Sequence, residues 1–164
     1  MSDSQKHLPG QLVAAIATLL CFAGIASASE GRRSPVGVWK MQVTFVTCDT
    51  GAAIRAPFPA LNTFYADHNI SEVGAGLAPA FRSVSHGRWV WTGRNTLAIK
   101  SEIQLFDSNF IYYAHQDFDR RFEMSGDGNT MTGKATYVRY GADGSEIFRG
   151  CATEEGTRQA EPTA

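Results

Sequence analysis

The sequence has almost no net charge, because 15 lysines and arginines face 16 aspartates and glutamates and leave a formal charge of −1. Nucleic-acid-binding proteins usually carry a basic excess or a clustered basic stripe. Neither is present: Arg32-Arg33 and Arg120-Arg121 are isolated pairs. We therefore expect no nucleic-acid partner.

Common catalytic motifs are also missing. The sequence contains no His-Glu-x-x-His, no Cys-x-x-Cys, no Gly-x-Ser-x-Gly and no glycine-rich phosphate-binding loop. The histidines beyond the N-terminal region, His68, His86 and His115, are too scattered to indicate a metal site by their spacing. We expect a non-enzymatic protein that has no cofactor and no metal.

Long apolar runs are confined to the N-terminus. A short polar start with Lys6 leads into an apolar run over residues 12–26, and Ala26-Ser27-Ala28 supplies the small residues of a cleavage site. This pattern predicts a secretory signal over residues 1–28. The alternative is a retained membrane anchor, but the run is short for a span that needs about 20 residues. We expect a secreted or periplasmic product that comprises residues 29–164 as a single domain, with its core at about 36–158.

Few cysteines remain after the predicted cleavage. Cys48 and Cys151 allow only one internal pairing, and export favours oxidation. A redox-active pair is the alternative, but such cysteines normally lie close together in the sequence. We therefore predict a structural disulfide, which in the chain-entropy account contributes about 4.7 kcal/mol for a loop of about 100 residues.

Helical patterns are scarce beyond the signal, and short apolar runs alternate with Gly, Asp and Asn, as is typical of all-β domains. Tight turns join most of the runs, so consecutive strands should be antiparallel neighbours. Residues 49–60 and 74–86 form two longer connections, either rim loops over a barrel mouth or simple surface connections. The pattern predicts a single antiparallel up-and-down barrel of about eight strands, over residues 36–47, 61–66, 69–74, 87–93, 96–106, 110–124, 130–140 and 145–152.

Alternation along the strands places one apolar face toward a common interior. Barrels of this size hold one small ligand or only their own side chains. If the first and last strands pair with Cys48 opposite Cys151, Trp39 falls opposite position 160 and within reach of Arg158. A guanidinium would then stack on an indole and help to close the barrel.

The Gly37-Val38-Trp39 segment, the eight-stranded meander and the late Arg158 together resemble the lipocalins and the wider calycin group. In that group a Gly-x-Trp opens the barrel and a basic residue from near the last strand covers the tryptophan. The resemblance assigns these closure roles to Gly37, Trp39 and Arg158. Other segments, such as His86-Gly87-Arg88-Trp89 and Gly150-Cys151-Ala152-Thr153, are similar to small exported bacterial proteins of unassigned function.

Candidate ligand-binding residues come mainly from one long strand. Gln116 and Arg120 share the face that carries Tyr112 and Phe118. A buried guanidinium is costly without a partner, so Arg120 would orient an acidic group while the aromatic residues hold an apolar body. Alternatively, Arg120 lies near the barrel end and reaches solvent, or a β-bulge reverses the two faces. His86 is a second candidate, as a rim proton donor or acceptor or as a loop hydrogen-bonding group.

The acidic residues of the opposite face of that strand, Asp117, Asp119 and Glu123, are expected to form a solvated surface with Arg121. We therefore predict an exported barrel that carries or senses a small, mainly apolar and possibly acidic ligand. A protein-binding module that acts through its two long connections, such as an inhibitor of an exported protease, is the first alternative. An isomerase or cyclase that uses the pocket as a shape template is the second, and the oligomeric state stays open.

Overall fold

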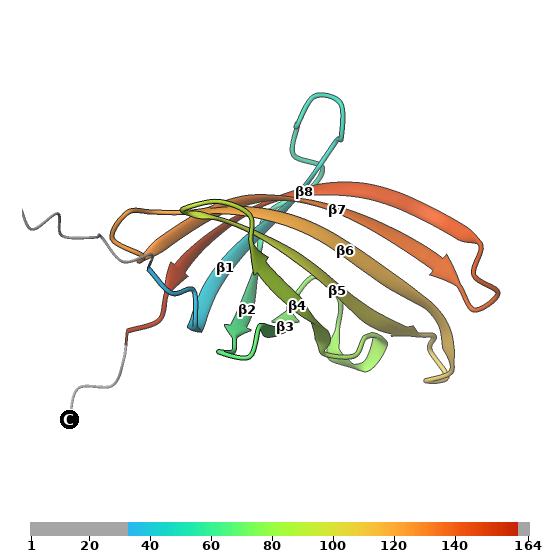
Figure 1. Cartoon of the computed structure of the whole chain (residues 1–164). Helices are drawn as coiled ribbons and strands as arrows, with labels where there is room; N and C mark the ends of the chain where they lie inside the picture. Colours follow the sequence, from blue (N-terminus) through green and yellow to red (C-terminus); the bar gives the residue numbers. More distant parts are fainter. Residues whose placement is uncertain (1–32, 161–164) are drawn as a thin grey trace, which may run out of the picture. The chain divides into compact units, whose positions relative to one another are not determined.

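The computed structural model describes residues 33–160, so the predicted signal over residues 1–28 lies outside the described residues. Eight strands follow one another and close into an antiparallel up-and-down barrel, which confirms the predicted fold class (Figure 1). The strands are β1 (Gly37–Val46), β2 (Phe58–Phe64), β3 (Asn69–Gly74), β4 (Ser85–Trp91), β5 (Thr96–Phe106), β6 (Tyr112–Met124), β7 (Thr130–Gly141) and β8 (Glu146–Arg158).

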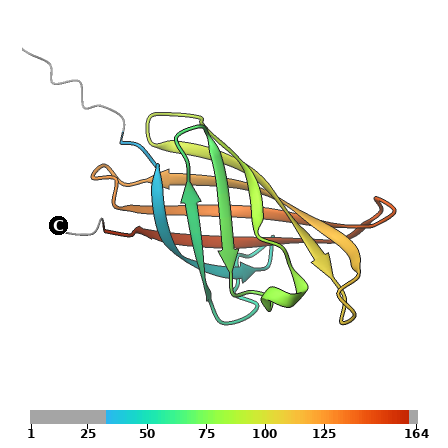
Figure 2. The same ribbon diagram turned by 90° about the horizontal axis from the view of Figure 1, so that it is seen from below.

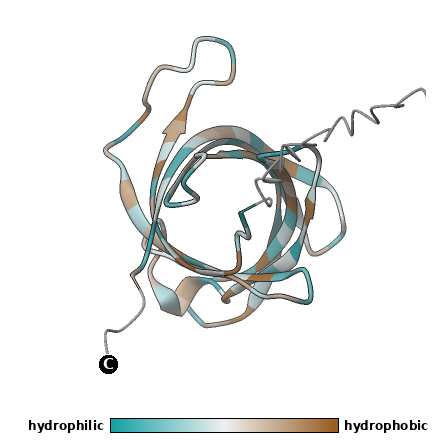
Figure 3. Cartoon of the chain, turned by 60° about the vertical axis from the view of Figure 1, so that its left-hand side comes forward, coloured by the Kyte–Doolittle hydropathy of each residue, from teal (hydrophilic) through white to brown (hydrophobic). Residues whose placement is uncertain are grey.

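The only helical element within residues 33–160 is a single 3-10 turn, η1 (Pro79–Phe81), in the connection between β3 and β4. Within the same residues, no helix has the length and apolar character needed to cross a membrane. Viewed nearly along its axis, the barrel is a closed ring of strands (Figure 3). Its two walls differ in height, because β5–β8 have 11 to 13 residues and β2–β4 have six or seven, so the long hairpins project at one end (Figure 2).

The seam between β1 and β8 closes the barrel with a register different from the expected one. Trp39 pairs with Arg158 and Val46 pairs with Cys151, so the register is shifted by two positions from a Cys48–Cys151 pair. A shift of two keeps every side chain on its expected face. The correction arises because Cys48 lies in the turn after β1 and reaches back to Cys151 from there.

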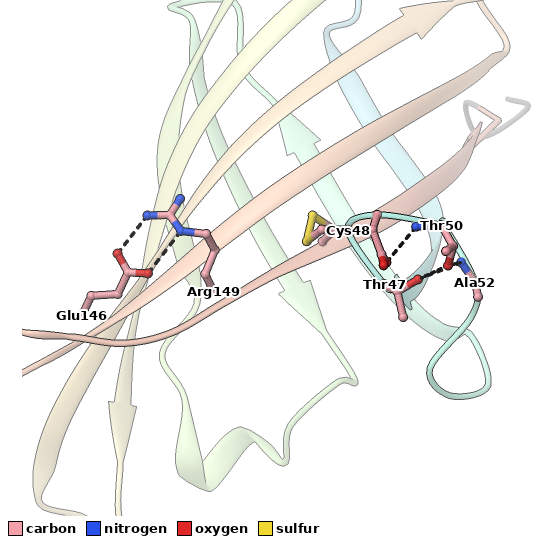
Figure 4. Close-up of a disulfide and its surroundings, with 8 residues drawn as sticks. Thr47, Cys48, Thr50, Ala52, Glu146 and Arg149 are labelled. Atoms are coloured by element: carbon pink, nitrogen blue, oxygen red, sulfur yellow. Dashed lines mark hydrogen bonds and ion pairs between the residues drawn. A yellow bond between two sulfur atoms is a disulfide. The ribbon is translucent and has the colours of Figure 1, made fainter.

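The disulfide joins Cys48 to Cys151 with a Cα–Cα distance of 5.2 Å (Figure 4). It lies on the outside of the barrel, since Cys48 is exposed and Cys151 alternates with the buried Gly150 and Ala152. The bond links the β1–β2 connection to the middle of β8. It therefore anchors the start of the β1–β2 connection to the barrel wall.

Arg158 closes the other end of the seam over Trp39. The guanidinium carbon lies 4.5 Å from the centre of the indole, and the group donates to the carbonyls of Ser34, Val36 and Gly128. Gly37 has a φ of 130°, which favours glycine, and a Cβ there would lie 3.1 Å from the Arg158 Nη1. Glycine is therefore favoured at position 37, two residues before Trp39. The contact of Arg158 with Trp39 also requires β8 to continue to Arg158 rather than end near residue 152.

The half of the barrel beneath Trp39 is filled by its own side chains. Trp39 packs edge-on against Phe64 with ring centres 6.4 Å apart, and Phe64 packs similarly against Trp89. The fully buried residues Leu97, Ile99, Phe122, Met124 and Met131 complete this closed end. Any internal space must therefore lie toward the opposite end, which we call the rim and which the β1–β2, β3–β4, β5–β6 and β7–β8 connections form.

Candidate functional site

A cavity of about 190 Å³ occupies the rim half of the barrel. Aromatic side chains form much of its wall, and Leu77, Gly76 and Arg55 from the two long connections reach it. Of the two alternatives for these connections, rim loops or simple surface connections, the structure shows rim loops. The aromatic residues of the wall are Phe45, Phe58, Phe118, Tyr137 and Phe148.

Backbone geometry sets the position of the largest of these rings. Tyr137 on β7 pairs with Gly150 on β8, and a Cβ at residue 150 would overlap the phenol ring. The ring therefore lies directly against the β8 backbone. Its centre is 5.1 Å from that of Phe45, 6.2 Å from that of Phe118 and 5.9 Å from that of Phe148. Tyr137 thus links the aromatic side chains of three other strands.

Charged side chains form the inner boundary of the cavity. Arg120, in the middle of β6, is 2% exposed and forms a close ion pair with Glu72 of β3. Its Nε lies 3.3 Å from the Glu154 Oε1 of β8, and the Nη2 of Arg82 lies 3.5 Å from the Glu72 Oε1. We call these four residues the inner ion cluster. It contains two cations and two anions, so its own charges balance.

Burial and ion pairing shift the pKa values of this cluster in opposite directions. Burial lowers the pKa of Arg120, but the charges of Glu72 and Glu154 outweigh it and raise that pKa, so the guanidinium stays charged. Burial raises the pKa of Glu154 above its usual range, Arg120 opposes the rise, and Glu72 adds to it. The Arg120 Nη1 is buried and has no hydrogen-bond acceptor within residues 33–160. A donor in that state requires water or a ligand.

Two further arginines lie nearer the rim, and we call Arg55 and Arg139 the rim arginines. Arg139 donates from Nε and Nη2 to the Gln116 Oε1 at 3.3 and 3.1 Å. Arg55 donates to the Gly76 carbonyl at 3.2 Å, and its guanidinium carbon lies 4.5 Å from the ring centre of Phe45. All these acceptors are neutral. The cavity wall therefore carries four guanidinium groups against two carboxylates.

Three of the five candidate ligand-binding residues line the cavity: Gln116, Phe118 and Arg120. Tyr112 lies outside it, because a β-bulge changes the pairing from Leu105–Ala114 to Phe106–Tyr112 and reverses the face of the first residues of β6. The exposed Tyr112 packs against Phe106, with ring centres 6.5 Å apart. The β-bulge that the sequence analysis allows for this strand is therefore present, but it displaces Tyr112 rather than Arg120.

His86 also lies away from the cavity. It belongs to β4, points outward, and pairs with Ser71 on one side and Glu102 on the other. The strand register brings Glu102, His115 and Asp117 together on this outer surface, with potential metal-ligating atoms within 4.8 Å of one another. Sequence spacing alone does not indicate this group. Its members are exposed or half-buried, and no second observation within residues 33–160 points to an ion there.

The sequence analysis missed several residues of the cavity wall, and two of them could have been found from strand alternation. Glu72 falls between the interior positions Ile70 and Gly74, and Glu154 falls between Ala152 and Gly156. Strand parity therefore places both carboxylates inside. Glu154 was missed because the predicted last strand ends at residue 152, whereas β8 continues to Arg158. Arg55 was missed because it reaches the cavity from an irregular connection.

Comparison with known proteins leaves the chain without an assigned relative. No protein-family model matches it, and no curated protein and no solved structure shows significant similarity to it. The closed barrel of eight antiparallel strands is compatible with a lipocalin-like architecture.

Proposed function

We propose that this protein is an exported carrier or sensor that binds one small, mainly apolar molecule in the rim half of its barrel. The observation that carries the proposal is the aromatic cavity whose inner boundary presents the buried Arg120 Nη1 without a protein acceptor. Such a site combines an apolar body with one orienting polar contact. A ligand whose inner end carries a neutral acceptor, such as a carbonyl or ether oxygen, would satisfy this donor.

The volume limits the ligand's size. An engineered apolar cavity of about 150 Å³ holds benzene. The cavity of about 190 Å³ therefore suits a single ring with a short substituent, or an aliphatic molecule of similar size. Native mass spectrometry of the protein isolated from the cells that export it should show a bound molecule of this size class. An unliganded mass in every preparation would count against the proposal.

The proposal includes export and a lipocalin-like relationship. A disulfide is typical of proteins in oxidising compartments, which supports a secreted or periplasmic location. The covered Trp39 and the Gly37 beside Arg158 support membership of the calycin group. Neither inference affects the binding test.

A protein-binding function is the second candidate, favoured by exposed apolar residues on the long connections. Ile54 lies on the first connection, and Leu77, Phe81 and Val84 lie on the second. A stable protein complex that is lost when these connections are replaced, but survives filling of the cavity, would favour this alternative.

Filling the cavity should weaken ligand binding without unfolding the barrel. Ala152 lines the cavity from β8 and is buried, so Ala152→Leu places extra methyl groups in the ligand space. We expect the affinity for 3-phenylpropanol, measured by isothermal titration calorimetry, to fall at least about tenfold, the effect of losing roughly 1.4 kcal/mol.

The matched control is Ala98→Leu, which makes the same change on the outward face of β5. It should bind 3-phenylpropanol as the unaltered protein does. Equal affinities for both variants would show that the ligand binds elsewhere. A lack of binding of both this alcohol and its carboxylic acid analogue to the unaltered protein would refute a site for single-ring ligands.

A further inference from the structure

We propose that the rim arginines, Arg55 and Arg139, together with the Tyr137 hydroxyl form an anion-binding clamp, and that the ligand is accordingly a small organic acid. This inference rests on the proposed binding function and adds a ligand class and an orientation. The acid group would lie at the rim, and the apolar body would point toward the inner ion cluster.

Positive charge is unevenly distributed along the cavity. The inner ion cluster is neutral as a whole, because Arg120 and Arg82 are matched by Glu72 and Glu154. The excess positive charge therefore belongs to the rim arginines. No carboxylate within residues 33–160 forms an ion pair with either, and their hydrogen-bond acceptors are an amide and a carbonyl oxygen. An anionic ligand would supply the missing countercharge.

Both guanidinium groups and the Tyr137 ring line the same cavity. Arg139 lies two positions beyond Tyr137 on the same face of β7. Arg55 comes from the β1–β2 connection and stacks on Phe45, whose ring centre is 5.1 Å from that of Tyr137. Burial raises the pKa of Tyr137, and Arg139 and Arg55 oppose that rise. The phenol therefore stays protonated at neutral pH, when its hydroxyl can donate to an anion held between the arginines.

Contacts within the protein hold the clamp in place before a ligand arrives. The guanidinium of Arg55 stacks on Phe45 and Phe58, with distances of 4.5 and 4.8 Å to the ring centres. Arg139 is held by two donations to Gln116. Each guanidinium has five N–H groups, so both keep donors for a carboxylate. Side chains that are already ordered lose less entropy on binding.

The orientation follows from the same charges. A carboxylate placed beside Arg120 would also lie near Glu72 and Glu154, which repel it, whereas no such carboxylate pairs with the rim arginines. The structure thus reassigns the acid-binding role that the sequence suggested for Arg120. Arg120 is left to donate its Nη1 to a neutral acceptor at the inner end of the ligand.

The test compares 3-phenylpropanoate with 3-phenylpropanol, two probes of nearly equal size that differ in charge. We expect calorimetry at pH 7 and low salt to show the acid binding at least tenfold more tightly. In Arg139→Gln, and separately in Arg55→Gln, this acid-to-alcohol ratio should fall about tenfold. The control Arg149→Gln removes an exposed arginine paired with Glu146, outside the cavity wall, and should leave the ratio unchanged.

The outcomes separate the two proposals. If both probes bind and both are lost in Ala152→Leu, but the acid shows no preference that depends on Arg55 and Arg139, the clamp is wrong and the binding function stands. If Arg149→Gln lowers the ratio as much as Arg139→Gln does, general surface charge explains the preference and the clamp is likewise wrong. If neither probe binds, both proposals fail for single-ring ligands.

Discussion

Replacement of both Cys48 and Cys151 by serine is expected to lower the free energy of unfolding by about 4.7 kcal/mol under oxidising conditions. The disulfide spans 103 residues, and cross-linking a loop of this size removes much conformational freedom from the unfolded chain. Domains of this kind have a total stability of about 5–15 kcal/mol, so the disulfide supplies about a third of that stability or more. Urea unfolding of both proteins, monitored by tryptophan fluorescence, measures the difference.

Reduction of the unaltered protein is the control for this prediction. It breaks the same bond without a substitution and should give a similar loss. The serine side chains themselves should matter little, because the disulfide lies on the outer surface. A loss no greater than about 0.5 kcal/mol, which is usual for surface substitutions, would show that the unfolded chain does not gain the expected freedom.

Replacement of Arg120 by methionine is expected to cost about 3–5 kcal/mol at neutral pH, because it leaves two buried carboxylates without their shared guanidinium. Glu72 and Glu154 both pair with Arg120. The control is Arg121→Met, one position along β6, whose side chain is 68% exposed and 3.9 Å from Asp119. An exposed pair of this kind should cost less than about 1 kcal/mol. Equal losses in the two variants would contradict the inner ion cluster as described.

The stability deficit of Arg120→Met, which is its loss of unfolding free energy relative to the unaltered protein, should also depend on pH. The pKa of Glu154 is raised in the folded protein, mainly by burial. Its contribution to stability is therefore fully present below the unfolded pKa, about 4.3, and is lost as pH rises through the folded pKa. Without Arg120 the folded pKa rises further, so the stability deficit should grow as the pH rises from about 4.3 toward neutrality. Urea unfolding across this range measures it, and a constant deficit would contradict a buried, unpaired Glu154.

Much of the fold could be predicted because the sequence pattern of a strand lies within the strand and its adjacent turns. Alternating apolar residues and the Gly-, Asp- and Asn-rich turns predicted all eight strands and their order. The closure by Trp39 and Arg158 followed from the assumed pairing of the first and last strands and from the resemblance to the lipocalins. The register of the β1–β8 seam did not, because a disulfide can be made from a turn as well as from a paired position. The shift of two residues arises because Cys48 reaches Cys151 from the turn after β1, and sequence spacing does not show where a strand gives way to a turn.

The site was only partly predictable, for a different physical reason. Alternation placed Gln116, Phe118 and Arg120 inside the barrel, but it could not show which strands face one another across it. The pairing of Arg120 with Glu72 joins positions 48 residues apart on strands that are not neighbours. Likewise, the irregular β1–β2 connection that brings Arg55 to the cavity has no periodicity to read.

The location of ligand binding is the central claim, and a methyl-resolved NMR titration with 3-phenylpropanoate tests it most directly. The ligand should shift the methyl signals of Val43 and Ile103, which line the cavity, in a saturable manner. The signals of Leu97 and Ile99, packed in the closed end, should stay in place. Saturable shifts confined to an outward residue such as Val73, or no shifts at all, would contradict a ligand-binding barrel.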